Sequence, residues 1–294
     1  MTARATADVT ARTAFVFAGG GSLGAVQVGM LQVLLDARMR PDFVVGSSVG
    51  AINAAYFAGA PDPGGVARLA DLWTGLRRAD VFPLTLASAL GLLFHPKSLV
   101  SPKRLRRLLE THIGFARIED ARVALHVLAT DQQGAGVQLS SGPAVDAILA
   151  SAAVPGVFPP VTIDGRALMD GAIAANTPLR LAARLGATRI VVLPTGYACA
   201  LEAPPQGVVA KALHAITLLI AWQLMHELEA MPADVQVHLV PTLCPLEVSP
   251  YDFSASRELI DRARRTTREW LDGGGLDRPA RAHELAAHHH HRAG

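Results

Sequence analysis

The stretch TAFVFAGGGSLGAVQVGMLQVLLDA (residues 13–37) begins with an apolar run, passes through a glycine-rich turn and ends in a segment of helical periodicity. Aromatic and β-branched residues in the run at 13–18 predict a buried strand. In the segment at 25–37, Val26, Met30 and Val33 recur at the spacing of one helical face. A strand that leads through glycines into a helix is the βα unit of an α/β fold.

A second unit of the same kind, DFVVGSSVGAINAAYFAG, occupies residues 42–59. Apolar patterning and turn residues extend the alternation along the chain. Further strands are predicted at 123–130, 138–140, 189–194 and 235–240, a hairpin at 161–170, and helices at 66–76, 144–152, 178–185, 208–231 and 254–271, with one more opening at Ser101 and Pro102. We therefore predict an α/β fold with a mainly parallel central sheet sandwiched between helices. Residues 1–12 are expected to form a flexible arm, 13–272 a single domain and 273–294 a mobile tail.

The composition excludes several classes of protein. Of 294 residues, 50% are hydrophobic and 18% charged, which supports a sizeable core and excludes intrinsic disorder. The net charge of +2 lacks the basic excess typical of nucleic-acid-binding proteins, so no nucleic-acid partner is expected.

Location is predicted from the cysteines and the hydropathy. Cys199 and Cys244 lack zinc-site spacing and fit a reducing compartment, with one bridge between them left open as an alternative. The start of the chain shows no secretory signal, and no apolar stretch reaches the roughly 18–20 residues of a membrane span. A cytoplasmic location is therefore expected.

The turn at Gly46-x-Ser48-x-Gly50 follows a predicted strand and precedes a predicted helix. This is the context of a nucleophile elbow, in which small flanking residues let the chain bend sharply and a substrate approach the serine. An ordinary small-residue turn is the alternative.

The turn GGGSLG (residues 19–24) also joins a strand to a helix. Consecutive backbone N–H groups there could stabilise the oxyanion of acyl transfer. The same turn satisfies the dinucleotide pattern G-x-G-x-x-G through Gly19, Gly21 and Gly24. That alternative requires an acidic residue at the end of the second strand, whereas the only acid, Asp42, stands at its start.

A serine nucleophile needs a base. Asp170, followed by Gly171 in a tight loop after the hairpin, is the best candidate. Asp131 is interpreted as structural or supporting. A conventional histidine-based site, with His214 or His226, is kept as a variant.

Five motifs in order resemble the patatin-like phospholipases: GGGSLG, GSSVG, ATD at 129–131, ASAAVPGVFPPV at 150–161 and MDGAIAANTPL at 169–179. The resemblance implies a three-layer sheet sandwiched by helices and a Ser-Asp dyad without a metal or other cofactor. It assigns Ser48 as nucleophile, Asp170 as base and the backbone of Gly19, Gly20, Gly21 and Ser22 as oxyanion hole. Gly24, Gly46, Gly50 and Gly171 support these motifs.

By the same resemblance, the substrate is an acyl lipid, such as a phospholipid, a lysophospholipid or a neutral lipid. The family usually has Arg or Lys where this chain has Leu23, which puts head-group preference in doubt. The apolar segment 81–94 and the basic run 103–107 could dock peripherally on anionic lipid, unless 81–94 is buried. A catalytically silent lipid-binding module remains the other alternative.

Overall fold

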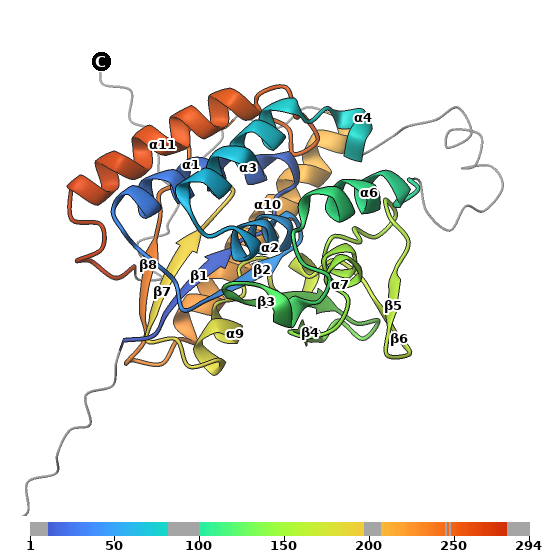
Figure 1. Ribbon diagram of the computed structural model, residues 1–294, viewed down its shortest axis with the longest axis horizontal. Helices are drawn as coiled ribbons and strands as arrows, with labels where there is room; N and C mark the ends of the chain where they lie inside the picture. The colour runs from blue at the N-terminus through green and yellow to red at the C-terminus, as the bar shows by residue number, and fades with distance from the viewer. Residues whose placement is uncertain (1–10, 82–99, 197–206, 245, 247, 281–294) are drawn as a thin grey trace, which may run out of the picture.

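A computed structural model of the chain describes residues 11–81, 100–196, 207–244, 246 and 248–280. At its centre lies a six-stranded sheet in the order β4-β3-β2-β1-β7-β8 (Figure 1). All neighbouring strands are parallel except β3 and β4. The strands are β1 (Thr13–Phe17), β2 (Phe43–Ser47), β3 (Ala124–Thr130), β4 (Gly136–Leu139), β7 (Arg189–Leu193) and β8 (Gln236–Leu239). A separate hairpin is formed by β5 (Val161–Ile163) and β6 (Arg166–Leu168).

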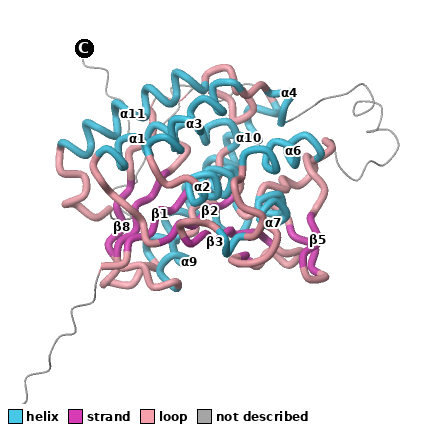
Figure 2. The backbone as a smooth tube through the Cα atoms, in the orientation of Figure 1, coloured by secondary structure: helices cyan, strands magenta, loops and turns pink. Residues whose placement is uncertain are grey.

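Helices cover both faces of the sheet, as Figures 1 and 2 show. The larger layer contains α1 (Ala25–Asp36), α2 (Val49–Gly59), α3 (Pro63–Gly75), α6 (Lys103–His112), α7 (Ala144–Ser151) and α11 (Ser256–Asp272). The opposite layer contains α9 (Leu179–Arg184) and α10 (Val208–Glu229). The short elements are η1 (Gly21–Gly24), α4 (Arg78–Val81), η2 (Ile118–Asp120) and α8 (Ala172–Ala175).

The two layers are built on the alternation of strand side chains. Phe15 and Phe17 of β1 join the core under α1 and α2, whereas Ala14 and Val16 join the core under α9 and α10. Successive residues of a strand point to opposite faces, so a strand covered on both sides is apolar throughout. The predicted α/β sandwich with a mainly parallel sheet is confirmed.

The differences from the predicted elements are local. The helix expected from residue 66 begins at Pro63, because the Asp62 carboxylate caps it by accepting the Gly65 N–H at 2.8 Å. The four-residue helices α4 and α8 were not predicted, since one turn carries no periodic signal.

The strand order positions the site. The chain leaves β1 toward β2 and β3 on one side, and β7 and β8 lie on the other. Loops that follow the carboxyl ends of β1, β2 and β3 therefore meet at one edge of the sheet, where α/β proteins bind ligands.

Two regions outside the sheet relate to predictions made from the sequence: the cytoplasmic location of the protein and the mobile tail at 273–294. Cys244, after β8, is disulfide-bonded, and Cys199 lies outside the described residues. A disulfide is more typical of oxidising compartments, so it does not support the expected cytoplasmic location. Ala280, which lies within the expected tail, donates its N–H to the Val237 carbonyl at 2.7 Å. Across the described residues, we find no helix with both the length and the hydropathy to cross a bilayer.

Candidate active site

Ser48 occupies the sharp turn between β2 and α2. Its backbone has φ 56° and ψ −130°, a conformation that side-chain-bearing residues rarely adopt. The turn requires glycine at position 50, because an added Cβ there would lie 2.2 Å from the Phe17 carbonyl oxygen. Ser48 is thus held in the strained strand–turn–helix geometry that presents a side chain above a sheet edge.

The hydroxyl of Ser48 donates a hydrogen bond to Asp170, 122 residues further along the chain. Ser48 Oγ and Asp170 Oδ2 are 2.7 Å apart. The other carboxylate oxygen, Asp170 Oδ1, accepts the Ala172 N–H at 2.8 Å. The two residues that the sequence singled out are therefore in direct contact.

The Asp170 backbone is fixed to the end of β3 and to the loop after α7. Met169 and Thr130 exchange backbone hydrogen bonds of 2.8 and 2.9 Å. The Thr130 hydroxyl donates to the Asp170 carbonyl at 2.7 Å, and the Asp170 N–H donates to the Ala153 carbonyl at 3.0 Å. These bonds set the direction in which the carboxylate points.

Ser151, at the end of α7, contacts the segments of both residues. Its hydroxyl accepts the Ser48 N–H at 2.9 Å and donates to the Leu128 carbonyl at 2.6 Å. Its backbone carbonyl accepts the Gly171 N–H at 3.1 Å. Sequence reasoning missed this residue, and its place in the stretch 150–161 was the only signal for it.

Burial perturbs the Asp170 carboxyl. The side chain is nearly inaccessible, and this desolvation raises its pKa from 3.8 to about 6, although the hydrogen bonds from Ser48 and Ala172 act in the opposite direction. A carboxylate with a raised pKa is a stronger base than an ordinary one. The group is therefore better suited to accept a hydroxyl proton than its residue type suggests.

The glycine turn after β1 offers fewer free donors than its sequence implies. The Gly19 N–H donates to the Asn176 carbonyl at 3.0 Å, and the Ser22 N–H donates to the Pro250 carbonyl at 2.8 Å. Among the four predicted oxyanion-hole residues, the described structure gives no hydrogen bond to another segment for the N–H groups of Gly20 and Gly21. Gly21 needs its lack of a side chain, because its φ is 60° and a Cβ would lie 2.4 Å from that Pro250 carbonyl.

The remaining motif residues have structural surroundings. Asp131 accepts the N–H groups of Gln133 and Ala135 at 2.9 and 2.8 Å, which is the supporting role expected of it. A Cβ at any of three further glycines would lie within 2.7 Å of a neighbouring atom; these are Gly24, Gly46 and Gly171.

A cavity of about 720 Å³ opens onto Ser48 and Asp170. Its walls are mostly apolar and include Leu23, Leu72, Leu105 and part of α10. Leu23 therefore gives this cavity an apolar wall where the resemblance would have placed a cation. A cavity of this size and character accommodates a large apolar ligand with one polar group near its reactive end.

Histidine is not the partner of Ser48 in the described structure. His214 lines the cavity, but the hydrogen bond of the Ser48 hydroxyl goes to Asp170. His226 faces outward and lies 3.3 Å from the Glu229 carboxylate. The histidine-based variant thus gains no support from the geometry.

The dinucleotide alternative also lacks support. The Pro250 carbonyl occupies the Ser22 N–H, one of the donors that a pyrophosphate would use at this helix entrance. β2 ends at Ser47 without the acidic residue that would bind a ribose.

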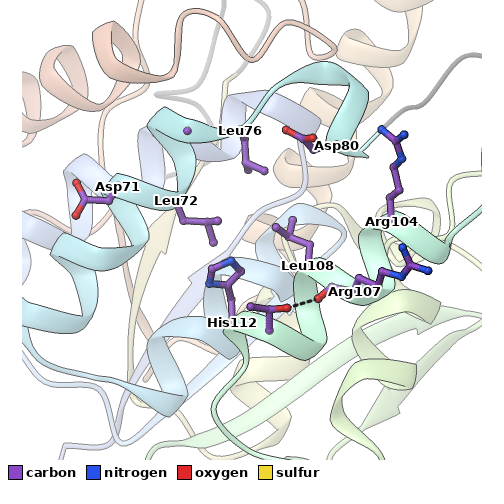
Figure 3. Close-up of a pocket in the computed structure, with 10 residues that line it drawn as sticks. Asp71, Leu72, Leu76, Asp80, Arg104, Arg107, Leu108 and His112 are labelled. Atoms are coloured by element: carbon purple, nitrogen blue, oxygen red, sulfur yellow. Dashed lines mark hydrogen bonds between the residues drawn. The ribbon is translucent and has the colours of Figure 1, made fainter.

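A second groove of about 550 Å³ lies between α6 and the α3–α4 region (Figure 3). α6 contributes Arg104 and Arg107, while α3 and α4 contribute Asp71 and Asp80. The apolar residues Leu72, Leu76 and Leu108 line both this groove and the cavity at Ser48. The groove thus contains both acidic and basic side chains, and the three leucines separate it from the cavity at Ser48.

Comparison with known proteins finds relatives that match part of this chain. The neuropathy target esterase sws of Drosophila melanogaster and the patatin-like phospholipase domain-containing protein M110.7 of Caenorhabditis elegans are each 27% identical over 184 residues, or 62% of this chain. Those regions make up 13% and 16% of the two relatives, so the chain spans a small part of their length.

The solved structure of VipD from Legionella pneumophila aligns with a TM-score of 0.50 at 15% identity, over 91% of this chain and 67% of that one. This likeness speaks to the fold alone. Residues 15–183, more than half of the chain and the part that carries both Ser48 and Asp170, match the family described as Patatin-like phospholipase. The chain belongs to the patatin-like phospholipase family.

Proposed function

We propose that the protein is a serine acyl-ester hydrolase that acts on lipids of the phospholipid, lysophospholipid or neutral-lipid class. The observation that carries the proposal is the 2.7 Å hydrogen bond from Ser48 Oγ to Asp170 Oδ2, two residues that line a large, mostly apolar cavity. The family of the chain supports the lipid substrate, and a relative named as a neuropathy target esterase supports the reaction.

In the proposed reaction, Asp170 accepts the hydroxyl proton while Ser48 Oγ attacks the ester carbonyl carbon. The carbonyl oxygen becomes an oxyanion, which accepts hydrogen bonds from the N–H groups of Gly20 and Gly21; each such donor contributes roughly 3–4 kcal/mol. Asp170 then returns the proton to the leaving alcohol. In the second half, a water molecule gives a proton to Asp170 and its oxygen attacks the acyl-serine carbonyl. The bond to Ser48 Oγ then breaks, the fatty acid leaves, and Asp170 returns the proton to Ser48 Oγ.

The shape and lining of the cavity indicate how a lipid substrate would bind. An acyl chain bound along the walls of Leu72 and Leu105 would bring its ester to Ser48, and burial of apolar surface at about 25 cal/mol per Å² would hold it there. Leu23 presents no charge near the glycine turn, so we expect recognition to depend on the acyl chain more than on an anionic head group.

The experiment compares Ser48→Ala and Asp170→Asn on a short-chain aryl ester and on a panel of lipids. Both variants should lose at least about 10³-fold in kcat, because each removes a component that acts only in the transition state. Ser47→Ala is the matched control: this neighbouring serine of the same motif is fully buried, and its hydroxyl has no described partner.

Fluorophosphonate labelling should modify Ser48 in the wild type and in Ser47→Ala, and should be lost in Ser48→Ala. Retained hydrolysis by folded Asp170→Asn would refute the dyad. Labelling of Ser48 without product release from any lipid would favour the silent lipid-binding module, and saturable NAD(P) binding without labelling would favour the nucleotide-binding alternative.

A further inference from the structure

The large hydrophobic side chains that are exposed in the described part of the chain gather in one place. Four of them lie within seven residues of α10: Ile216 is 51% exposed, Leu218 44%, Leu219 65% and Trp222 59%. The fifth, Ile173, is 43% exposed and follows Asp170 by three residues. Exposed apolar residues on a soluble protein are normally scattered, so such a cluster marks an interaction surface.

The cluster lies on the helix face that points away from the core. Leu224 and Leu228 are buried in the core under β1 and β7, and the buried Glu227 pairs with Arg180 of α9. At 100° per residue, Leu218, Leu219 and Trp222 lie on the side opposite to Leu224. This orientation is fixed, so the apolar face cannot turn inward without breaking the core contacts.

The apolar face continues into the rim of the catalytic cavity. Ile173, Ile216 and Leu219 line that cavity as well as being exposed. The Gln223 side chain joins the two rim segments, since it accepts the Asn176 N–H at 3.1 Å and donates to the Ile173 carbonyl at 3.0 Å. A lipid that left a surface in contact with α10 would enter the cavity without crossing water.

The charges around the face fit a lipid surface. Between residues 208 and 225, α10 contains no carboxylate, and its one permanently charged residue is the exposed Lys211. Leu218 and Trp222 follow Lys211 by seven and eleven residues, which are close to two and three helical turns. The three side chains therefore lie on the same side of the helix. A cation beside aromatic and aliphatic residues is the composition of a helix that lies in a membrane interface.

α6 is a weaker candidate for the same task. Arg106 is paired with Asp146 at 2.6 Å, and Arg104 and Arg107 line the groove that also contains Asp71 and Asp80. The mixed charges do not present a surface of one sign to anionic lipid. Residues 82–94, the apolar part of the predicted docking segment, lie outside the described residues.

We propose that the outer face of α10, formed by Leu218, Leu219 and Trp222 with Ile216 at the cavity rim, docks the protein on a phospholipid bilayer. Docking on this face turns the mouth of the cavity toward the bilayer, so that a lipid substrate enters between α10 and the loop after Asp170. The proposal rests on the proposed lipid hydrolysis for its purpose, but the contact with lipid is measurable without turnover.

The test uses Leu218→Gln/Trp222→Gln, because neither residue lines the cavity and the change adds no charge. Binding to vesicles of phosphatidylcholine with a minor fraction of phosphatidylglycerol is measured by flotation, on a Ser48→Ala background that leaves the vesicles intact. Removing two interfacial side chains should weaken partitioning roughly tenfold or more. Lys103→Gln/Arg107→Gln is the comparison for α6 and should bind nearly as well as the parent.

Hydrolysis of a water-soluble aryl ester separates the two proposals. With Ser48 restored, the α10 variant should keep its aryl-ester rate and lose hydrolysis of vesicle lipid. If the wild type lacks both activities, lipid hydrolysis fails while flotation still tests docking. Undiminished flotation of the α10 variant, or a loss confined to the α6 variant, would overturn the proposal. So would a wild-type dimer that ignores vesicles and that the α10 variant converts to monomers.

Discussion

Asp170→Asn is expected to stabilise the fold at neutral pH while it removes the proposed base. The native pKa of Asp170, about 6, lies roughly two units above its ordinary 3.8. At 1.36 kcal/mol per unit, ionising this carboxyl in the folded protein costs about 3 kcal/mol of stability. The folded state holds the proton more tightly than the unfolded state does. The stability that protonated Asp170 contributes is therefore fully present below pH 3.8 and is lost as the pH rises through about 6.

The asparagine variant has no charge to bury, but it changes the hydrogen bonds. If its amide nitrogen faces the Ala172 N–H, two donors meet and the cost is about 1–2 kcal/mol. If the amide turns, its nitrogen meets Ser48 Oγ, which can accept as well as donate. The net gain at about pH 8 is therefore about 1–3 kcal/mol, whereas below about pH 4 the variant should gain nothing or lose slightly.

The assay is urea unfolding followed by circular dichroism, for wild type and variant, at steps between about pH 4 and pH 8. The difference between the two proteins removes the pH dependence of all other groups. Ser48→Ala is the second arm: it removes a donor that favours the carboxylate, so its destabilisation should grow as the pH rises through about 6. A difference between wild type and Asp170→Asn that is flat with pH, or that grows toward acid, would refute the reasoning.

Three further outcomes are expected. Ester hydrolysis should fall as the pH drops through about 6, because protonated Asp170 cannot accept a proton; His214→Gln should leave this midpoint in place, and a midpoint that moves with His214 would point to an imidazole base. Ser151→Ala should lower the free energy of unfolding by about 1–3 kcal/mol and reduce kcat more than it raises KM, since a buried N–H loses its acceptor; unchanged unfolding and kinetics would contradict this. Gly50→Ala should cost about 1–3 kcal/mol or more, measured by urea unfolding, because its methyl group meets the Phe17 carbonyl; wild-type stability would show that the turn has room.

The fold was predictable because its signals are local. The strands flanking GGGSLG and GSSVG are short apolar runs that end in glycines, and the helices after them show one-face periodicity. The pairing of Ser48 with Asp170 was predicted from the order of motifs. The raised pKa of Asp170 was not predictable from the sequence, because segments distant along the chain bury the carboxyl.

What the sequence did not reveal depends on contacts between distant segments. The glycine turn looks like four equivalent donors, but loops around Asn176 and Pro250 occupy two of them. The periodicity of α10 located a helix, yet the pattern could not say that Leu219 and Trp222 face outward, since an apolar helix surface normally packs inward. The disulfide at Cys244 was open in the sequence for the same reason, because spacing alone does not show which thiols meet.

The position of Ser151 has a consequence for how the site tolerates motion. Ser151 accepts a hydrogen bond from the turn before α2 with its hydroxyl and one from the loop before α8 with its backbone carbonyl. Because Ser151 holds both segments, we expect a displacement of the end of α7 to move the Ser48 turn and the Gly171 loop together. The Ser48–Asp170 contact, on which the proposed proton transfer depends, should therefore be less sensitive to movement of α7 than a contact between two independently anchored loops.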